Sequence, residues 1–464
     1  MSSVAEATSG ETITERNERM TAKVVAWIEA NLGRVTAIER QARWRPAWFV
    51  EVDRKGSSLP LYVRGARDAS RVVYSLDQEA AVLQILEAHD VPVPHVYGMI
   101  ADPWAIVMDK LPGRAILANI QDAAQRRALL SDYMDFMARA HAIEPAKFEA
   151  AGLTMPADAA EHALSWFNGV EDIYRAAKKR PEPLLEFVVK WVRANVPTQG
   201  WESRFILGDP GQFLYEDGKI TGLLDFEFAH IGDIAHDLAS IRLRDVPEPF
   251  GDVGGGLLRY EQQSGKPLDM ALIDFHTVKW VMCTPLSLIA TLHDPPAVPD
   301  LLQSVEWFHQ YSLIGIEGIG NMIGVRLPDV DLPPASPSRY GPTHNVFPAA
   351  IRTLEGSEAH TQYKRDRAAA IAEYLRRADA YGLAIEAANL DDIQALLGER
   401  PADWRAGDAA LEAFVLAAGP ERDADLVRLF HRREMRHMRL LEPVLYRTKT
   451  IRHLDPLPEV LGRE

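Results

Sequence analysis

The sequence predicts an α+β fold with a small, strand-rich N-terminal lobe, a mostly helical second lobe and an added all-helical C-terminal domain. Three observations predict this architecture. Short strand-like runs are concentrated before residue 110, apolar residues at helical spacing dominate after it, and a proline-rich stretch interrupts the helical patterns. We therefore expect an N-terminal lobe over 1–110, a second lobe over 111–326, a linker over 327–348 and a helical domain over 349–464.

Helix and strand patterns alternate in the N-terminal lobe. Apolar residues at helical spacing predict a helix from Thr14 to Leu32. Ser75 with Gln78 three residues later is the capping box of a second helix. Short apolar runs predict strands at Trp48 to Val52, Leu61 to Arg64 and Ala105 to Met108.

The composition excludes several classes of protein. Hydrophobic residues make up 47% of the chain and charged residues 25%, which is typical of a soluble globular protein. The formal net charge of -15 argues against nucleic-acid binding by a basic surface. The apolar run from Trp280 to Leu292 is broken by Pro285 and is too short to span a membrane. With a single cysteine, Cys283, and no signal-peptide pattern, we expect a cytoplasmic protein, while its oligomeric state stays open.

One segment, residues 207–227, brings polar side chains together by local folding alone. Asp217-Gly218 between two apolar runs predicts a hairpin in which residues 213–215 pair with residues 219–223. Gln212 then lies at the open end of the hairpin, Asp225 follows the same end, and Asp209 is in the adjoining loop. Two carboxylates and an amide carbonyl therefore converge.

These groups suit phosphoryl transfer. One carboxylate can orient an attacking hydroxyl group and take its proton, while the other oxygen atoms can hold Mg²⁺. A surface hairpin with an acidic turn and no catalytic role is the alternative that the pattern alone leaves open.

The segment resembles the aminoglycoside phosphotransferase and choline kinase-like family, whose signature is His-Gly-Asp, a short loop, Asn, a hairpin and Ile/Leu-Asp-Trp/Phe-Glu. Asp209 matches the catalytic aspartate and Asp225 the metal-binding aspartate. The runs Gly232-Asp233 and Asp237-Leu238-Ala239 match the segment that follows. The resemblance implies a protein kinase-like two-lobed fold, with ATP and Mg²⁺ as cofactors and a small-molecule hydroxyl group as acceptor.

The sequence departs from this signature at two positions. Leu207 replaces the usual His, and Gln212 lies three residues after Asp209 where the family has Asn five residues after. Gln carries the same carbonyl ligand on a longer stem. An inactive, nucleotide-binding relative is therefore an alternative function.

Upstream residues extend the match to the nucleotide site. Glu79 shares a helical face with Leu83 and Leu86, an unfavourable place for a charge without a partner. The family pairs such a Glu with a basic strand residue that grips the ATP phosphates, and Arg64 in Tyr62-Val63-Arg64 is the candidate. The resemblance also implies adenine contacts at the hinge, through Met108, Asp109 and Leu111. Residues 38–48 fill the phosphate-loop position without a glycine, and contain instead Arg40, Arg43, Trp44, Arg45 and Trp48.

The acceptor is the least determined part of the prediction. The N-terminal motifs and the Asp-Phe-Glu segment look closer to the branch that phosphorylates hydroxyacyl-CoA, and an aminoglycoside or macrolide kinase is the alternative. Residues 349–464 faintly resemble a helical companion protein of that branch, with a stabilising or dimerising role as the other interpretation.

Two further patterns allow other interpretations. His230 to Asp237 contains a His-Asp pair that a metal phosphohydrolase could use with His141 and His162, although Asp233 is explained as a helix N-cap. The basic stretch from Arg428 to Arg439 is either a solvated helix face or an anion contact.

Overall fold

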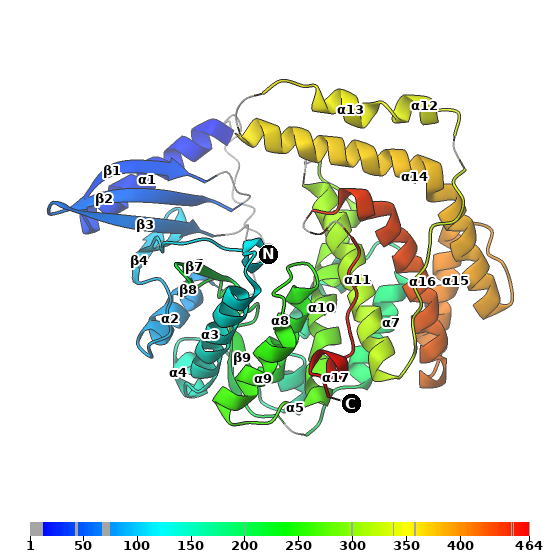
Figure 1. Cartoon of the computed structure of the whole chain (residues 1–464), viewed down its shortest axis with the longest axis horizontal. Coiled ribbons are helices and arrows are strands. Elements are labelled where there is room, and N and C mark those ends of the chain that lie inside the picture. Colours follow the sequence, from blue (N-terminus) through cyan, green and yellow to red (C-terminus); the bar gives the residue numbers. More distant parts are fainter. Residues whose placement is uncertain are drawn as a thin grey trace.

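The computed structural model describes residues 13–41, 45–66, 75–199, 201–297, 300–336, 338–356, 359–446, 448 and 450–463. A small antiparallel sheet with two helices forms the N-terminal lobe, and the rest is mostly helical (Figure 1). This is the predicted fold class. None of the helices in these ranges combines the length and the apolar character that crossing a membrane requires.

The N-terminal sheet has the strand order β1-β2-β3-β5-β4 and consists of β1 (Arg34–Arg40), β2 (Ala47–Arg54), β3 (Ser57–Gly65), β4 (Val96–Ala101) and β5 (Trp104–Asp109). Helix α1 (Ile13–Asn31) covers one face, where Val24 and Ile28 pack with Trp48 and Val107. Helix α2 (Leu76–Glu87) packs with the opposite face through Leu83 and its neighbours, and Ser75 forms the predicted capping box. A helix therefore packs on each face of the sheet.

The sequence prediction missed β1 and β4. The apolar residues of β1 are only partly buried, and β4 contains Gly98, so neither strand shows a strong apolar run. As a result, the segment predicted as the phosphate loop was too long. Residues 38–40 and 47–48 are strand, so the connection is 41–46, within which Arg43 and Trp44 lie outside the described residues.

The second lobe surrounds two small strand pairs with helices. Its strands are β6 (Arg204–Ile206), β7 (Phe213–Glu216), β8 (Lys219–Leu223) and β9 (His230–Gly232), and β7 and β8 form the predicted antiparallel hairpin. Its helices are α3 (Ala123–His141), α4 (Pro145–Ala150), α5 (Ala159–Ala163), α6 (Phe167–Ala177), α7 (Pro183–Ala194), α8 (Ile234–Asp245), α9 (Val253–Ser264), α10 (Met270–His293) and α11 (Leu301–Met322).

The C-terminal region is dominated by the long helix α14, which lies across the top of the molecule in Figure 1. The helices are α12 (Gly341–His344), α13 (Phe347–Arg352), α14 (Ala359–Leu397), α15 (Trp404–Ala417), α16 (Asp423–Leu441) and α17 (Leu457–Val460). The expectation of helix throughout 349–464 was wrong after Leu441, where only the short helix α17 is α-helical among the described residues. Pro443 lies just after the end of α16, where proline does not continue a helix.

The C-terminal region shares an apolar core with the second lobe. Phe430 of α16 stacks on Phe187 of α7, with ring centroids 5.6 Å apart. Leu411 and Val427 are buried in the same cluster as Val278 of α10. The tail after α16 also packs on the second lobe, where Leu454, Leu457 and Leu461 are buried. Residues of the C-terminal region thus complete the core beneath the second lobe.

This shared core predicts that the two regions unfold together. Replacing the buried Phe430 by Ala should lower the free energy of unfolding by about 3–5 kcal/mol, because it leaves a cavity between α7 and α16. Phe347→Ala is the matched control, since that ring is exposed. Thermal unfolding of the full chain should show a single transition for the second lobe and the C-terminal region. Its midpoint temperature should fall in Phe430→Ala and stay unchanged in the control. A separate low-temperature transition of residues 349–464 would contradict the shared core.

Candidate active site

The catalytic-loop candidate, residues 207–212, is hydrogen-bonded to Asp237 of α8. Its carboxylate accepts hydrogen bonds from the backbone N–H groups of Leu207 (2.7 Å) and Gly208 (2.9 Å). Gly208 has a φ of +89°, and a Cβ there would lie 2.1 Å from the carbonyl oxygen of Phe228. Only glycine fits this position, so the loop conformation is set by the backbone.

Asp237 is itself fixed by a buried chain of hydrogen bonds. His141 of α3 donates from Nε2 to Asp237 (2.9 Å), and the Tyr260 hydroxyl lies 2.8 Å from Nδ1 of His141. Leu207 stands where the family has His, and its side chain is buried in the apolar core. In this chain His141 supplies a polar support for the loop from another helix.

Asp209 lies between Gln212 and an arginine that the sequence prediction missed. The Gln212 amide nitrogen donates to Asp209 Oδ2 (2.7 Å), which turns the amide carbonyl oxygen away from Asp209. Arg244 at the end of α8 forms an ion pair with Asp209 and donates from Nε to the carbonyl oxygen of Pro210 (2.9 Å). Burial lowers the pKa of Arg244, but the contact with Asp209 outweighs burial and raises it.

The hairpin brings Asp225 to the same end of the site. The N–H of Leu224 donates to the carbonyl oxygen of Gln212 (2.9 Å), so the residue after β8 lies beside the residue before β7. Asp225 has a φ of +66°, in the left-handed region that non-glycine residues rarely adopt. Such backbone strain is typical of functional sites. Gln212 therefore contacts Asp209 through its side chain and lies beside the residue that precedes Asp225, while a shared site of all three residues stays a prediction.

Arg64 of β3 connects the N-terminal lobe to this end of the hairpin. Its guanidinium forms an ion pair with Glu79 of α2 and also contacts Asp225 (2.6 Å) and Glu227 (3.0 Å). The pairing of Arg64 with Glu79 expected from the sequence is present. Arg45, at the end of the β1–β2 connection, forms an ion pair with Glu227.

Negative charge exceeds positive charge around Arg64. Burial raises the pKa of the Glu79 carboxyl to about 7, and the nearby carboxylates of Asp225 and Glu227 also raise it. The Arg64 guanidinium lowers the same pKa, but by less. Burial lowers the pKa of Arg64, but the carboxylates outweigh burial and raise it, so the arginine stays charged. Three carboxylates share Arg64 and Arg45.

These residues fit a magnesium ion. Mg²⁺ is bound through one or two carboxylates and substrate phosphates, and it keeps several water ligands. Asp225 is partly exposed, supplies hard oxygen ligands and lies in a site with excess negative charge. The described residues contain no group of three or more His, Cys, Asp or Glu side chains arranged to hold a metal. His141, which the phosphohydrolase interpretation would use, forms hydrogen bonds with Asp237 and Tyr260.

The predicted hinge lies between the sheet and the hairpin. Met108 pairs with Tyr62 and Val96 inside the sheet, and the N–H of Asp109 donates to the carbonyl oxygen of His95 (3.0 Å). The side chain of Leu111 packs over Gly222 of β8. The adenine contacts assigned to these residues stay a prediction.

The comparisons with known proteins identify the family. The model of the phosphotransferase enzyme family matches residues 35–270, just over half of the chain. The chain belongs to the phosphotransferase enzyme family. The matched range includes Arg64, Glu79, Asp209 and Asp225, and ends at the first residue of α10. The family match therefore leaves the helical region after residue 270 unassigned.

Solved structures of such enzymes are similar at low identity. Macrolide 2'-phosphotransferase MphH from Brachybacterium faecium is 20% identical, with 59% of this chain and 98% of that chain covered and a TM-score of 0.45. A thermostable mutant of aminoglycoside phosphotransferase APH(4)-Ia, in a ternary complex with ADP and hygromycin B, is 10% identical, with coverages of 62% and 98% and a TM-score of 0.46. No curated protein matches the chain.

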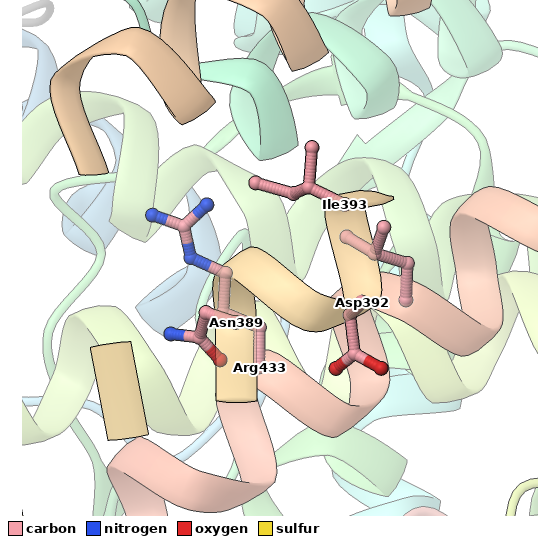
Figure 2. Close-up of a pocket in the computed structure, with 5 residues that line it drawn as sticks. Asn389, Asp392, Ile393 and Arg433 are labelled. Atoms are coloured by element: carbon pink, nitrogen blue, oxygen red, sulfur yellow. The ribbon is translucent and has the colours of Figure 1, made fainter. Parts of the chain in front are cut away.

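The basic stretch on α16 is neutralised by carboxylates. Arg432 and Arg436 both contact Asp392 of α14, at 2.8 Å and 2.7 Å, and Arg433 contacts Asp408 of α15 at 2.8 Å. Figure 2 shows Asn389, Asp392 and Ile393 of α14 around the same small pocket as Arg433. His431 and Arg436 are buried, so this stretch is not the solvated helix face that the sequence suggested. Its arginines instead pair with carboxylates where α14, α15 and α16 pack together.

The coupling of Arg64 and Glu79 can be measured directly. Arg64→Met and Glu79→Gln should each weaken Mg-ATP binding, because each removes one half of a buried ion pair. The double variant should lose less than the sum, with a coupling of about 0.5–3 kcal/mol. Calorimetric Kd values for Mg-ATP test this expectation. Arg34→Met with Asp53→Asn, an exposed pair on the same sheet, is the control. Strictly additive losses would mean that the contact does not matter for nucleotide binding.

Proposed function

We propose that this phosphotransferase moves the γ-phosphoryl group of ATP to a hydroxyl group of a small molecule. The observation that supports the proposal most is the position of the Arg64 guanidinium, which contacts Glu79 in the N-terminal lobe and Asp225 beyond the hairpin. A cation at this point can bind phosphate groups next to the metal ligands. The location that fits the single, buried Cys283 is the cytoplasm.

Asp209 is the proposed base. The acceptor hydroxyl oxygen attacks the γ-phosphorus, its proton passes to the Asp209 carboxylate, and the bond from phosphorus to the β–γ bridging oxygen breaks to release ADP. Arg64, oriented by Glu79, binds the phosphates of ATP. Backbone groups of Met108 to Leu111 bind the adenine ring.

Asp225 and the carbonyl oxygen of Gln212 are the proposed Mg²⁺ ligands. A bound Mg²⁺ neutralises charge on the phosphates and so helps to align them. Gln212 supports this role by pointing its amide nitrogen at Asp209, because the carbonyl oxygen is then directed elsewhere.

Arg244 is proposed to hold the Asp209 carboxylate in its reactive orientation. It is fixed on its other side by Glu248 (3.2 Å) and by the Pro210 carbonyl oxygen. The ion pair also motivates a second candidate function, since a base neutralised by Arg244 next to the altered Leu207 position would suit a module that binds nucleotide without catalysis.

The acceptor side is proposed to be lined by α11 and the C-terminal region. Burial raises the pKa of Tyr311 on α11 to about 12, and the nearby Arg244 and Asp209 side chains shift it in opposite directions. One turn and a half earlier on α11, Glu306 accepts hydrogen bonds from the N–H of Tyr446 (2.9 Å). The guanidinium carbon of Arg367 on α14 lies 4.8 Å from the centroid of the Tyr446 ring. These contacts lead from the proposed base to α14, in keeping with a helical region that helps to hold a bulky acceptor.

The proposed acceptor class is a hydroxyacyl-CoA thioester, on the motif resemblance of Tyr62-Val63-Arg64 and Asp225-Phe226-Glu227. The antibiotics named for the similar structures are the alternative acceptors.

Asp209→Asn tests the chemistry. Turnover should fall by about 10² to 10⁴, because a positioned base contributes that much, while Mg-ATP still binds. Asp135→Asn, which removes a carboxylate from a partly exposed pair with Arg259, is the matched control. ADP release and Mg-ATP affinity are measured separately. A wild-type protein that binds Mg-ATP and turns over no acceptor would favour the non-catalytic module.

The acceptor class is tested with a panel. Wild-type protein and Mg-ATP are mixed with a hydroxyacyl-CoA, with hygromycin B and with a macrolide, and acceptor-dependent ADP release is followed. We expect release with the hydroxyacyl-CoA, and Asp209→Asn to abolish it. Release with an antibiotic alone would contradict the acceptor class and leave the phosphotransferase function intact.

A further inference from the structure

Beneath the catalytic-loop candidate lies a buried cluster of basic side chains that the roles above do not use. His236 comes from α8 and Lys279 from α10. The rings of His230 and His276 lie against His236, and His162 lies near Lys279. All five side chains are buried, with Lys279 and His236 fully enclosed. A buried lysine is costly for stability, since burial removes the hydration of its charge.

Two hydrogen bonds in series connect Lys279 to the loop through His236. The Lys279 ammonium lies 3.0 Å from Nδ1 of His236, and Nε2 of His236 lies 3.1 Å from the carbonyl oxygen of Gly208. The Lys279 ammonium also donates a hydrogen bond to the carbonyl oxygen of Ser165 (3.4 Å). Gly208 directly precedes Asp209 in the chain.

The charge of Lys279 sets the direction of both bonds. An ammonium group has donors and no acceptor, so Nδ1 of His236 must accept. Burial holds the pKa of His236 well below its usual value, so the ring is neutral and carries its single proton on Nε2. That proton is donated to Gly208. Burial also lowers the pKa of Lys279 to about 8, which leaves it charged at neutral pH.

Both backbone polar groups of Gly208 are therefore hydrogen-bonded to consecutive residues of α8. Asp237 accepts from its N–H, and His236 donates to its carbonyl oxygen. Gly208 has a φ of +89° and lacks a side chain, so its backbone can adopt many conformations. A rotation of its backbone would displace Asp209.

We propose that Lys279 and His236 form a relay that positions Asp209 for phosphoryl transfer, by locking the carbonyl group of Gly208. They act through the loop and touch no substrate, so they are positioning residues. The relay rests on the proposed function, because it assigns a purpose to the geometry of Asp209. It also offers a second polar support for a loop in which Leu207 stands at the usual His position.

The test compares four substitutions in the cluster, two at His236 and one each at His276 and Lys279. His236→Leu removes the donor to Gly208, and His236→Gln restores a donor near the position of Nε2. His276→Leu makes the same change of volume in an equally buried imidazole of the cluster. The reaction is Mg-ATP hydrolysis with water as acceptor, and Mg-ATP affinity is measured alongside.

We expect kcat to fall about 10- to 100-fold in His236→Leu with Mg-ATP affinity unchanged, since a small displacement of the base has that cost. His236→Gln should recover most of the loss, and Lys279→Met should resemble His236→Leu. His276→Leu should keep its kcat. A wild-type kcat in His236→Leu, or an equal loss in His276→Leu, would overturn the relay.

A second measurement keeps the test independent of turnover and of the stability of the variants. Nitrogen-15 NMR of histidine-labelled wild-type protein, with the His236 signals assigned from His236→Gln, reports the tautomer. The relay requires a proton on Nε2 and none on Nδ1. A proton on Nδ1 would overturn it. If wild-type protein shows no turnover with water or any acceptor, the proposed function fails, while the tautomer still decides the relay.

Discussion

The Arg64 guanidinium is the interaction on which the arrangement of the site depends. It comes from the central part of the N-terminal sheet and is buried, and it reaches carboxylates in α2 and beyond the β7–β8 hairpin. A buried charge is stable only when it is paired, and the ion pairs with Glu79, Asp225 and Glu227 engage both terminal nitrogen atoms of the guanidinium. Because these partners belong to both lobes, the same contacts join the lobes and orient the cation. A phosphate group entering this site would compete with Asp225 and Glu227 for Arg64.

The second constraint is the catalytic-loop candidate, residues 207–212, which is short and is hydrogen-bonded to α8. Asp237 and His236 are neighbours in sequence, yet they reach opposite sides of Gly208 because successive residues of a helix point in different directions. Each is backed by a buried residue from another helix, His141 for Asp237 and Lys279 for His236. Polar networks of this kind are stable when every member has a partner, and they then fix one conformation. The loop geometry thus depends on α3, α8 and α10 together.

Local patterns in the sequence predicted the parts of the site that are close in the chain. Asp217-Gly218 set the hairpin, and the hairpin set the positions of Gln212 and Asp225. The pairing of Arg64 with Glu79 followed from a charge on an apolar helix face. Arg244 was missed, although it lies two turns after Asp237 on α8, where the same face carries Asp237, Ile241 and Arg244. Lys279 had no local signal, because its partner is 43 positions away. The shared core of the C-terminal region also depends on long-range contacts such as Phe187 with Phe430, which no local pattern encodes.

The central claim is that Arg64 passes from carboxylates to nucleotide phosphates while Asp209 stays directed at the acceptor. A crystal structure with Mg²⁺ and a nonhydrolysable ATP analogue tests it most directly. The account predicts that Arg64 keeps Glu79 and exchanges Asp225 for a phosphate oxygen, and that Asp225 and Gln212 bind the metal. Asp209 should remain on its loop, free of the metal. A nucleotide bound elsewhere, or bound with Arg64 still on Asp225 and Glu227, would contradict the account.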